Sequence, residues 1–431
     1  MNHLSICVAL LFFLISDGYS QTRKEEIYTD FVLSQKRASL SRDLRERIIG
    51  KTYPLALDSN TEYKYESACE SISQFLFTGP DVDSLFDKMF DHYDHLQDET
   101  RRSFLEAVYA VAPKKYLSNI REILASENDP KLFSICAAYL YRINSSANNG
   151  AFLKTKLVKK FPRYDTVPIV SELEKYLSFH HSWSLQKAPD ISQLFLYQRT
   201  TRQKVIYSFQ RWNRDYPGLA IIQNADGSFA RQPGGKLMVF EQLARSGSDL
   251  PYFITNGSTP QGVFSIQGIE VAHNLFIGPT PNIQMIMPFE SGWEKFFFDH
   301  TGTGMDSLEL YLELLPSSWR NYQPMMESWW AGRIGRTEII AHGTTIDPEY
   351  FKGRPFYPLA PTLGCLCAKE LWNPANGHLL VSEQFNLVSA FQSSPGTKGY
   401  VYVINIDDQE KPVSRSEVEG WVNQFEKKNK P

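Results

Sequence analysis

Apolar residues recur at helical spacing through the first half of the chain, from about residue 25 to 180. The segments 80–97, 98–113, 114–126 and 128–143 each place them three and four positions apart, with turn residues such as Gly79-Pro80-Asp81 between. Short helices of about 12 residues joined by short breaks resemble the hairpins of helical-repeat proteins, although these segments share no clear consensus. The pattern predicts an all-α, helical-repeat-like domain over residues 21–185.

The pattern changes after residue 185, where alternating apolar positions indicate strands. The strand candidates are 217–231, 262–271, 337–343 and 399–407. Helical patterns at 305–316 and 382–392 interrupt them, and a capping box from Ser414 to Glu417 predicts a last helix. We therefore expect an α+β protein, with a β-rich domain carrying helical insertions over residues 186–431.

The first twenty residues form a separate element with an apolar run from Leu4 to Ile15, followed by the small residues Gly18 and Ser20. This arrangement is typical of a cleaved signal peptide over residues 1–20. An uncleaved membrane anchor is the alternative, but the run is short for a bilayer span of about 20 residues. The sequence thus predicts an exported protein, with no stable membrane span after cleavage.

Composition narrows the function classes. The 431 residues are 42% hydrophobic and 22% charged, which is typical of a globular protein with more than one domain. The net charge is −3 and Lys and Arg form no basic block, so no nucleic-acid partner is expected. Of the four cysteines beyond residue 20, Cys69 and Cys136 fall on apolar helix faces and are expected to be buried and free.

The other two cysteines, Cys365 and Cys367, are too close for a relaxed disulfide and follow a turn rich in Pro, Thr and Gly. Acyl transfer by a thiol needs an imidazole to accept its proton and N–H donors for the oxyanion. His342-Gly343 ends an apolar segment, and Gly364 precedes Cys365. These residues make Cys365 a candidate nucleophile; a structural role and a metal site are the alternatives.

A third stretch, Gly257-Ser258-Thr259-Pro260-Gln261-Gly262-Val263-Phe264, comes earlier in the chain. Its pattern G-x-T-P-x-G-x-F, then His342-Gly343, then Thr362-Leu363-Gly364-Cys365, resembles the L,D-transpeptidase family with the YkuD-type catalytic domain, in residue type and in order. The resemblance covers roughly residues 215 to 406 and leaves the helical half unexplained.

The resemblance implies a site and a reaction. Cys365 would be the nucleophile acylated by the stem peptide of peptidoglycan, and His342 would be the base, oriented by the Gly343 carbonyl. The N–H groups of Gly364 and Cys365 would bind the oxyanion, and Thr362, Thr259 and Gly262 would lie at substrate-binding positions. Such enzymes exchange a terminal D-amino acid for an amine or water and need no metal or cofactor. An exported enzyme of this kind would act in the periplasm or cell envelope. Apart from the resemblance, we expect the helical domain to bind a protein partner or a glycan.

The chain departs from the family pattern at two positions beside the thiol. Leu363 stands where the family keeps a His, and Cys367 where it keeps Arg or Asn. Two alternatives therefore stay open: a catalytically inactive exported binding or scaffold protein, and an L,D-carboxypeptidase or endopeptidase using the same Cys and His. Asp347 is a further candidate to orient His342. One group of aromatic residues would either wall a cleft or pack a core: Trp293, Phe296, Phe297, Phe298, Trp329 and Trp330.

Overall fold

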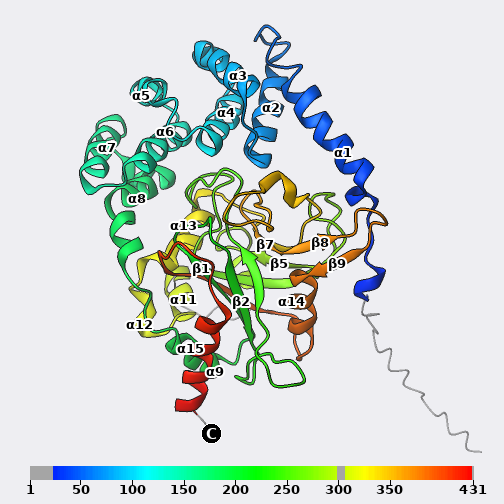
Figure 1. Cartoon of the computed structure of the whole chain (residues 1–431). Helices are drawn as coiled ribbons and strands as arrows, with labels where there is room; N and C mark the ends of the chain where they lie inside the picture. Colours follow the sequence, from blue (N-terminus) through cyan, green and yellow to red (C-terminus); the bar gives the residue numbers. More distant parts are fainter. Residues whose placement is uncertain (1–22, 299–305, 430–431) are drawn as a thin grey trace, which may run out of the picture.

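The computed structural model describes residues 23–298 and 306–429, so the predicted signal peptide lies outside the described residues. Helices α1 to α8 form an arc over one end of a β-barrel (Figure 1). Their bounds are α1 Ser34–Arg42, α2 Glu62–Phe75, α3 Pro80–Asp91, α4 Asp98–Val111, α5 Leu117–Ser126, α6 Pro130–Ile143, α7 Ala147–Lys160 and α8 Pro168–Leu185. The next helix, α9 Ser192–Thr201, lies outside the arc, beside the C-terminal helix α15 (Arg415–Lys428). No described helix is long and apolar enough to cross a membrane.

The predicted helices are confirmed where the sequence has both periodicity and an explicit start. Pro80 and Pro130 occupy the first turns of α3 and α6, where a missing N–H costs nothing. Asp129 caps α6 by accepting hydrogen bonds from the N–H groups of Lys131 and Leu132. Cys69 and Cys136 are buried free thiols inside this helical part, as expected.

The second half is built on a closed barrel with the strand order β1-β10-β4-β5-β6-β7-β3-β2. The pairs β1–β10 and β6–β7 are parallel, and the others are antiparallel. A separate hairpin, β8 with β9, follows β7. The bounds are β1 Val205–Arg211, β2 Gly218–Gln223, β3 Phe240–Leu243, β4 Gly262–Glu270, β5 Asn282–Ile286, β6 Ala341–His342, β7 Leu366–Ala368, β8 Glu370–Trp372, β9 Leu379–Ser382 and β10 Gly399–Asp407.

Helices inserted between strands, and one that follows the last strand, complete this half. They are α10 Trp293–Phe296, α11 Ser307–Glu313, α12 Ser317–Arg320, α13 Glu327–Ile334, α14 Glu383–Gln392 and α15 Arg415–Lys428. The mixture agrees with the predicted α+β class. The capping box that starts α15 is present, with Ser414 and Glu417 bonded reciprocally.

Two apolar clusters hold the molecule together. One continues from the helical arc into the barrel and includes Ile72, Phe104, Phe264 and Leu366. The other packs the barrel against its inserted and C-terminal helices. The aromatic group singled out in the sequence belongs to this second cluster: Trp293 and Trp329 stack with ring centroids 5.6 Å apart. Packing, and not a cleft wall, is therefore the role of this group.

Candidate active site

The register of two short parallel strands brings the predicted nucleophile and base into one neighbourhood. Ala341 pairs with Leu366 and His342 with Cys367, so Cys365, one residue before β7, lies beside the residue before Ala341. Because side chains alternate along a strand, His342 and Cys365 fall on the face opposite to Ala341 and Leu366. The fold thus places His342 and Cys365, which are distant in sequence, on the same face of neighbouring strands.

The imidazole of His342 is held in one orientation and is 5% exposed. Its Nδ1 contacts the carbonyl oxygen of Gly343. Since a carbonyl oxygen only accepts, Nδ1 carries the ring proton and Nε2 is left to act as a base. The resemblance implied this contact. Burial lowers the pKa of His342 to about 4, so the ring is neutral at pH 7.

Gly343 is buried because a carboxyl group packs directly against its Cα. A Cβ at this position would lie 2.1 Å from the carboxyl carbon of Glu370. That carboxyl accepts hydrogen bonds from the Thr344 N–H, at 2.9 Å, and from the Ser382 hydroxyl, at 2.5 Å. Burial raises the pKa of Glu370 to about 7. Only glycine leaves room for this network at the end of β6.

Thr362 closes the turn that carries the thiol. Its Oγ1 accepts a hydrogen bond from the N–H of Gly364 at 3.0 Å and donates to the carbonyl of Cys365 at 3.0 Å. Gly364 adopts φ +127°, a conformation that favours glycine. The Gly364 N–H is therefore occupied in this conformation and does not serve the expected oxyanion role. The N–H of Cys365 remains the candidate donor.

Thr259 and Gly262 lie behind the site and do not line it. The hydroxyl of Thr259 is buried and donates to the carbonyl of Gly364 at 2.8 Å. This hydrogen bond holds the turn that carries Cys365. Gly262 has φ +121°, and a Cβ there would lie 2.3 Å from the Ser328 hydroxyl and 2.7 Å from that of Tyr311. The contacts that the structure gives these two residues support the turn, and their role in substrate binding stays a prediction.

Arg336 belongs to the site, although the sequence analysis did not single it out. Its guanidinium is buried and donates to the carbonyls of Ser258, at 3.0 Å, Gly257, at 2.8 Å, and Tyr252. A Cβ on Gly364 would lie 2.3 Å from Arg336 Nη2. The charge stabilises a thiolate at Cys365, which partly offsets the missing Arg at position 367. Its place six residues before His342 carries no distinguishing pattern in the sequence.

The thiol of Cys365 is nevertheless protonated at rest. The residue keeps some solvent exposure, and its sulfur donates to the carbonyl of Glu338 at 3.4 Å. Burial raises the pKa of Cys365 to about 11; Arg336 opposes this shift, while the carboxylates of Glu338 and Glu290 add to it. His342 is neutral as well, so the resting site holds no ion pair. Among the described residues, the Cys365 sulfur bonds to the Glu338 carbonyl and the imidazole to the Gly343 carbonyl, and no hydrogen bond joins the two side chains.

We expect iodoacetamide to alkylate Cys365 with a rate that keeps rising to about pH 11, because only the thiolate reacts and its pKa is raised. An ordinary thiol levels off near pH 8.5–9, and at pH 8 a pKa of about 11 leaves roughly one thiolate in a thousand. Intact mass against time at each pH measures the rate. Cys365→Ser is the control that removes the label. A plateau below pH 8 would show a preformed thiolate and contradict the expectation.

The remaining candidates take other roles. Cys367 is fully buried, with its sulfur 3.7 Å from the carbonyl of Ala368, and is a free thiol like Cys365. Asp347 forms an ion pair with Arg37 at 3.3 Å and caps the turn at Glu349, so its known contacts are not to His342. Among the described residues, no group of three or more His, Cys, Asp or Glu is arranged to hold a metal ion.

Four cavities lie among the described residues, and neither Cys365 nor His342 lines any of these four. One of these cavities is enclosed mainly by apolar side chains of the helical arc. Another is polar and lies where the arc meets the barrel, with Thr259 in its wall. No protein-family model matches this chain, and the searches of curated proteins and of solved structures returned no match.

Proposed function

We propose that the protein is an exported cysteine-dependent acyl transferase of the L,D-transpeptidase type, which acts on peptidoglycan stem peptides through Cys365 and His342. The observation that carries the proposal is the orientation of His342. Its Nδ1 is held by the Gly343 carbonyl, so Nε2 is the basic nitrogen. His342 pairs with Cys367, and Cys365 lies two residues earlier on the same face of the sheet. The ordered sequence motifs support the substrate class.

The reaction follows from these two groups. His342 Nε2 takes the thiol proton while the sulfur attacks an amide carbonyl, forming a C–S bond. The C–N bond then breaks, and the departing amine of the D-amino acid takes the proton from the imidazolium. An acceptor amine or water attacks the thioester, loses its proton to His342 and restores the thiol. Amine capture gives a transpeptidase, and water gives a carboxypeptidase or endopeptidase.

One observation favours a second candidate, a catalytically inactive binding or scaffold protein. Burial raises the pKa of Cys365 to about 11 and lowers that of His342 to about 4, so proton transfer between them is uphill in the ligand-free site. An active enzyme must reduce this difference when substrate binds. The inactive protein has no such requirement.

A carbapenem distinguishes the two, because it acylates a competent thiol and mimics the expected donor. We expect the mature protein to gain one carbapenem mass, and Cys367→Ser to gain it equally, since Cys367 is buried. Cys365→Ser should gain none. His342→Gln should slow acylation by about 100-fold or more, in the range of general-base contributions. The measurement is intact mass against time.

Two results would contradict the assignment. A label that persists in Cys365→Ser would place the nucleophile elsewhere. No adduct, together with no turnover of tetrapeptide stems, would favour the binding protein. If acylation occurs, product analysis with and without an acceptor amine separates transfer from hydrolysis.

A further inference from the structure

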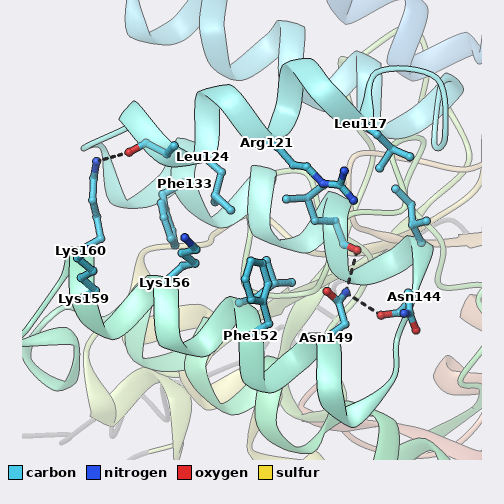
Figure 2. A pocket seen from close by; sticks show the side chains of 14 residues that line it. Leu117, Arg121, Leu124, Phe133, Asn144, Asn149, Phe152, Lys156, Lys159 and Lys160 are labelled. Carbon is cyan, nitrogen blue, oxygen red and sulfur yellow. Dashed lines mark hydrogen bonds between the residues drawn. The ribbon is translucent and has the colours of Figure 1, made fainter.

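A groove in the helical arc combines apolar and cationic lining residues. It lies between α5 and α7, is also lined by α6, and encloses about 530 Å³ (Figure 2). Its apolar lining residues come from all three helices: Leu117, Leu124, Ala125, Phe133, Leu140, Ile143, Phe152 and Leu153. A volume of this size is in the range of about 300–1,000 Å³ that ligand sites occupy.

Packing explains why the groove stays open. Leu153 and Leu157 of α7 are buried, and Gly150 brings α7 so close to α8 that a Cβ would lie 2.2 Å from the Leu177 carbonyl. The tight contact of α7 is therefore with α8. Phe152 is left 56% exposed and projects from α7 into the groove (Figure 2).

The polar lining of the groove is strongly basic. Its charged lining residues are all cationic: Arg121, Lys156, Lys159 and Lys160. Residues 144–164 contain no Asp or Glu, in a chain whose net charge is −3. Lys160 donates to the carbonyls of Ala125 and Ser126 at the end of α5, at 3.1 and 3.0 Å. Among the described residues, Arg121, Lys156 and Lys159 form no salt bridge. The Lys156 ammonium lies 5.4 Å from the centroid of the Phe152 ring, so the cation and the aromatic ring form one surface.

The cations line both walls of the groove: Arg121 comes from α5, and Lys156, Lys159 and Lys160 come from α7. Figure 2 shows the three lysines toward one end and Arg121 nearer the other, with Phe152 between them. A helix lying between α5 and α7 can present carboxylates to both walls while one apolar stripe fills the floor. Cations on two facing helices therefore favour a helical peptide over the single headgroup of an anionic lipid.

We propose that this groove binds an acidic amphipathic helix of a partner protein, with its apolar face on Phe133 and Phe152 and its carboxylates beside Lys156, Lys159 and Arg121. Concave surfaces of stacked helix pairs serve this purpose in repeat proteins. The proposal is independent of the chemistry at Cys365, and it gives the helical half of the chain a role of its own.

The test uses the mature chain, residues 21–431, and a designed fluorescent 20-residue peptide. The peptide carries a Leu/Phe stripe flanked by Glu on both sides. A scrambled isomer without the stripe and a Glu→Lys version are the comparison probes. Fluorescence anisotropy should show saturable binding of the first peptide alone. Binding should weaken at higher salt, because exposed charges are screened over about 10 Å at 0.1 M salt.

Variants locate the binding. The double change Lys156→Glu with Lys159→Glu should weaken the complex at least tenfold, and so should Phe152→Ser. Lys131→Glu, an exposed change on α6 outside the groove, is the matched control and should stay within twofold. Thermal unfolding of each variant separates loss of binding from loss of folding. Equal binding by the groove variants would overturn the proposal.

Vesicles of phosphatidylglycerol and phosphatidylcholine test the alternative that the groove binds a lipid surface. If the chain cosediments with them, loses this on Lys156→Glu with Lys159→Glu, and does not bind the peptide, the groove is a lipid surface and the proposal is wrong. If neither probe binds, or the scrambled peptide binds equally, the proposal fails as well. In each case the carbapenem result at Cys365 stands unchanged, so the two proposals fail separately.

Discussion

Gly343→Ala is expected to lower the free energy of unfolding by roughly 3 kcal/mol or more, by overpacking and by disturbing buried hydrogen bonds. The new Cβ would lie within 2.3 Å of three atoms of the Glu370 carboxyl group. Glu370 cannot withdraw freely, because the Thr344 N–H and the Ser382 hydroxyl bond it from the other side. The same shift would displace the carbonyl that holds His342 Nδ1.

Urea unfolding followed by circular dichroism measures the change. Gly420→Ala is the matched control, since Gly420 lies in α15 with no atom within 4 Å of a Cβ. In a helix interior that exchange should stabilise by about 0.5–1 kcal/mol. Opposite signs are thus expected for the same substitution at two glycines. Equal effects at both positions would contradict the close approach at Gly343.

The second large effect is expected from Arg336→Met, which should destabilise the protein by roughly 3–5 kcal/mol because hydrogen bonds from a charged donor contribute about 1.5–3 kcal/mol each. The substitution leaves the buried carbonyls of Tyr252, Gly257 and Ser258 without this donor. It also removes the positive charge next to Cys365. The alkylation rate of Cys365 at pH 9 should therefore fall as well.

Arg333→Met is the control from the same region. Arg333 is exposed on α13, 5.4 Å from the Trp330 ring, and its replacement should change stability by less than about 1 kcal/mol. Arg336→Lys keeps the positive charge but lacks the planar guanidinium that reaches several carbonyls at once. This variant should therefore be less stable than the parent protein but retain more thiol reactivity than Arg336→Met. If Arg336→Met reacts faster at pH 9 than the parent, the electrostatic role of Arg336 is wrong.

Local signals carried most of the helical prediction. Helices α4 to α6 begin and end within three residues of the expected segments, because capping residues, prolines and apolar spacing act over one or two turns. The expected segment 80–97 instead divides into α3, which ends at Asp91, and a 3-10 helix at Tyr93–His95. The strands were harder to predict from the sequence. Segments 262–271 and 399–407 became β4 and β10, whereas 337–343 yielded only the two residues of β6. The short strands β3, β5 and β7 have too few residues to show a period of two.

In the candidate site, too, local features were predictable from the sequence and contacts between distant segments were not. Motif order singled out Cys365, His342 and Gly343, and the contact between His342 Nδ1 and the Gly343 carbonyl is local enough to follow from adjacent residues. Thr259 and Gly262 were expected to bind substrate, which stays a prediction; the structure adds that both are buried and support the neighbouring segments. Arg336 was missed because its partners, residues 252, 257 and 258, are about 80 positions away.

By itself, the sequence determined the helical first half, the mixed second half and the identity of the candidate nucleophile and base. These depend on interactions within a few residues, where spacing is enough. The tertiary structure alone decided that β6 and β7 run side by side, that the Gly364 N–H is taken by Thr362, and that basic side chains of α5 and α7 face one apolar groove. Each of these is a contact between segments, or a choice of hydrogen-bond partner, and depends on how the whole chain packs.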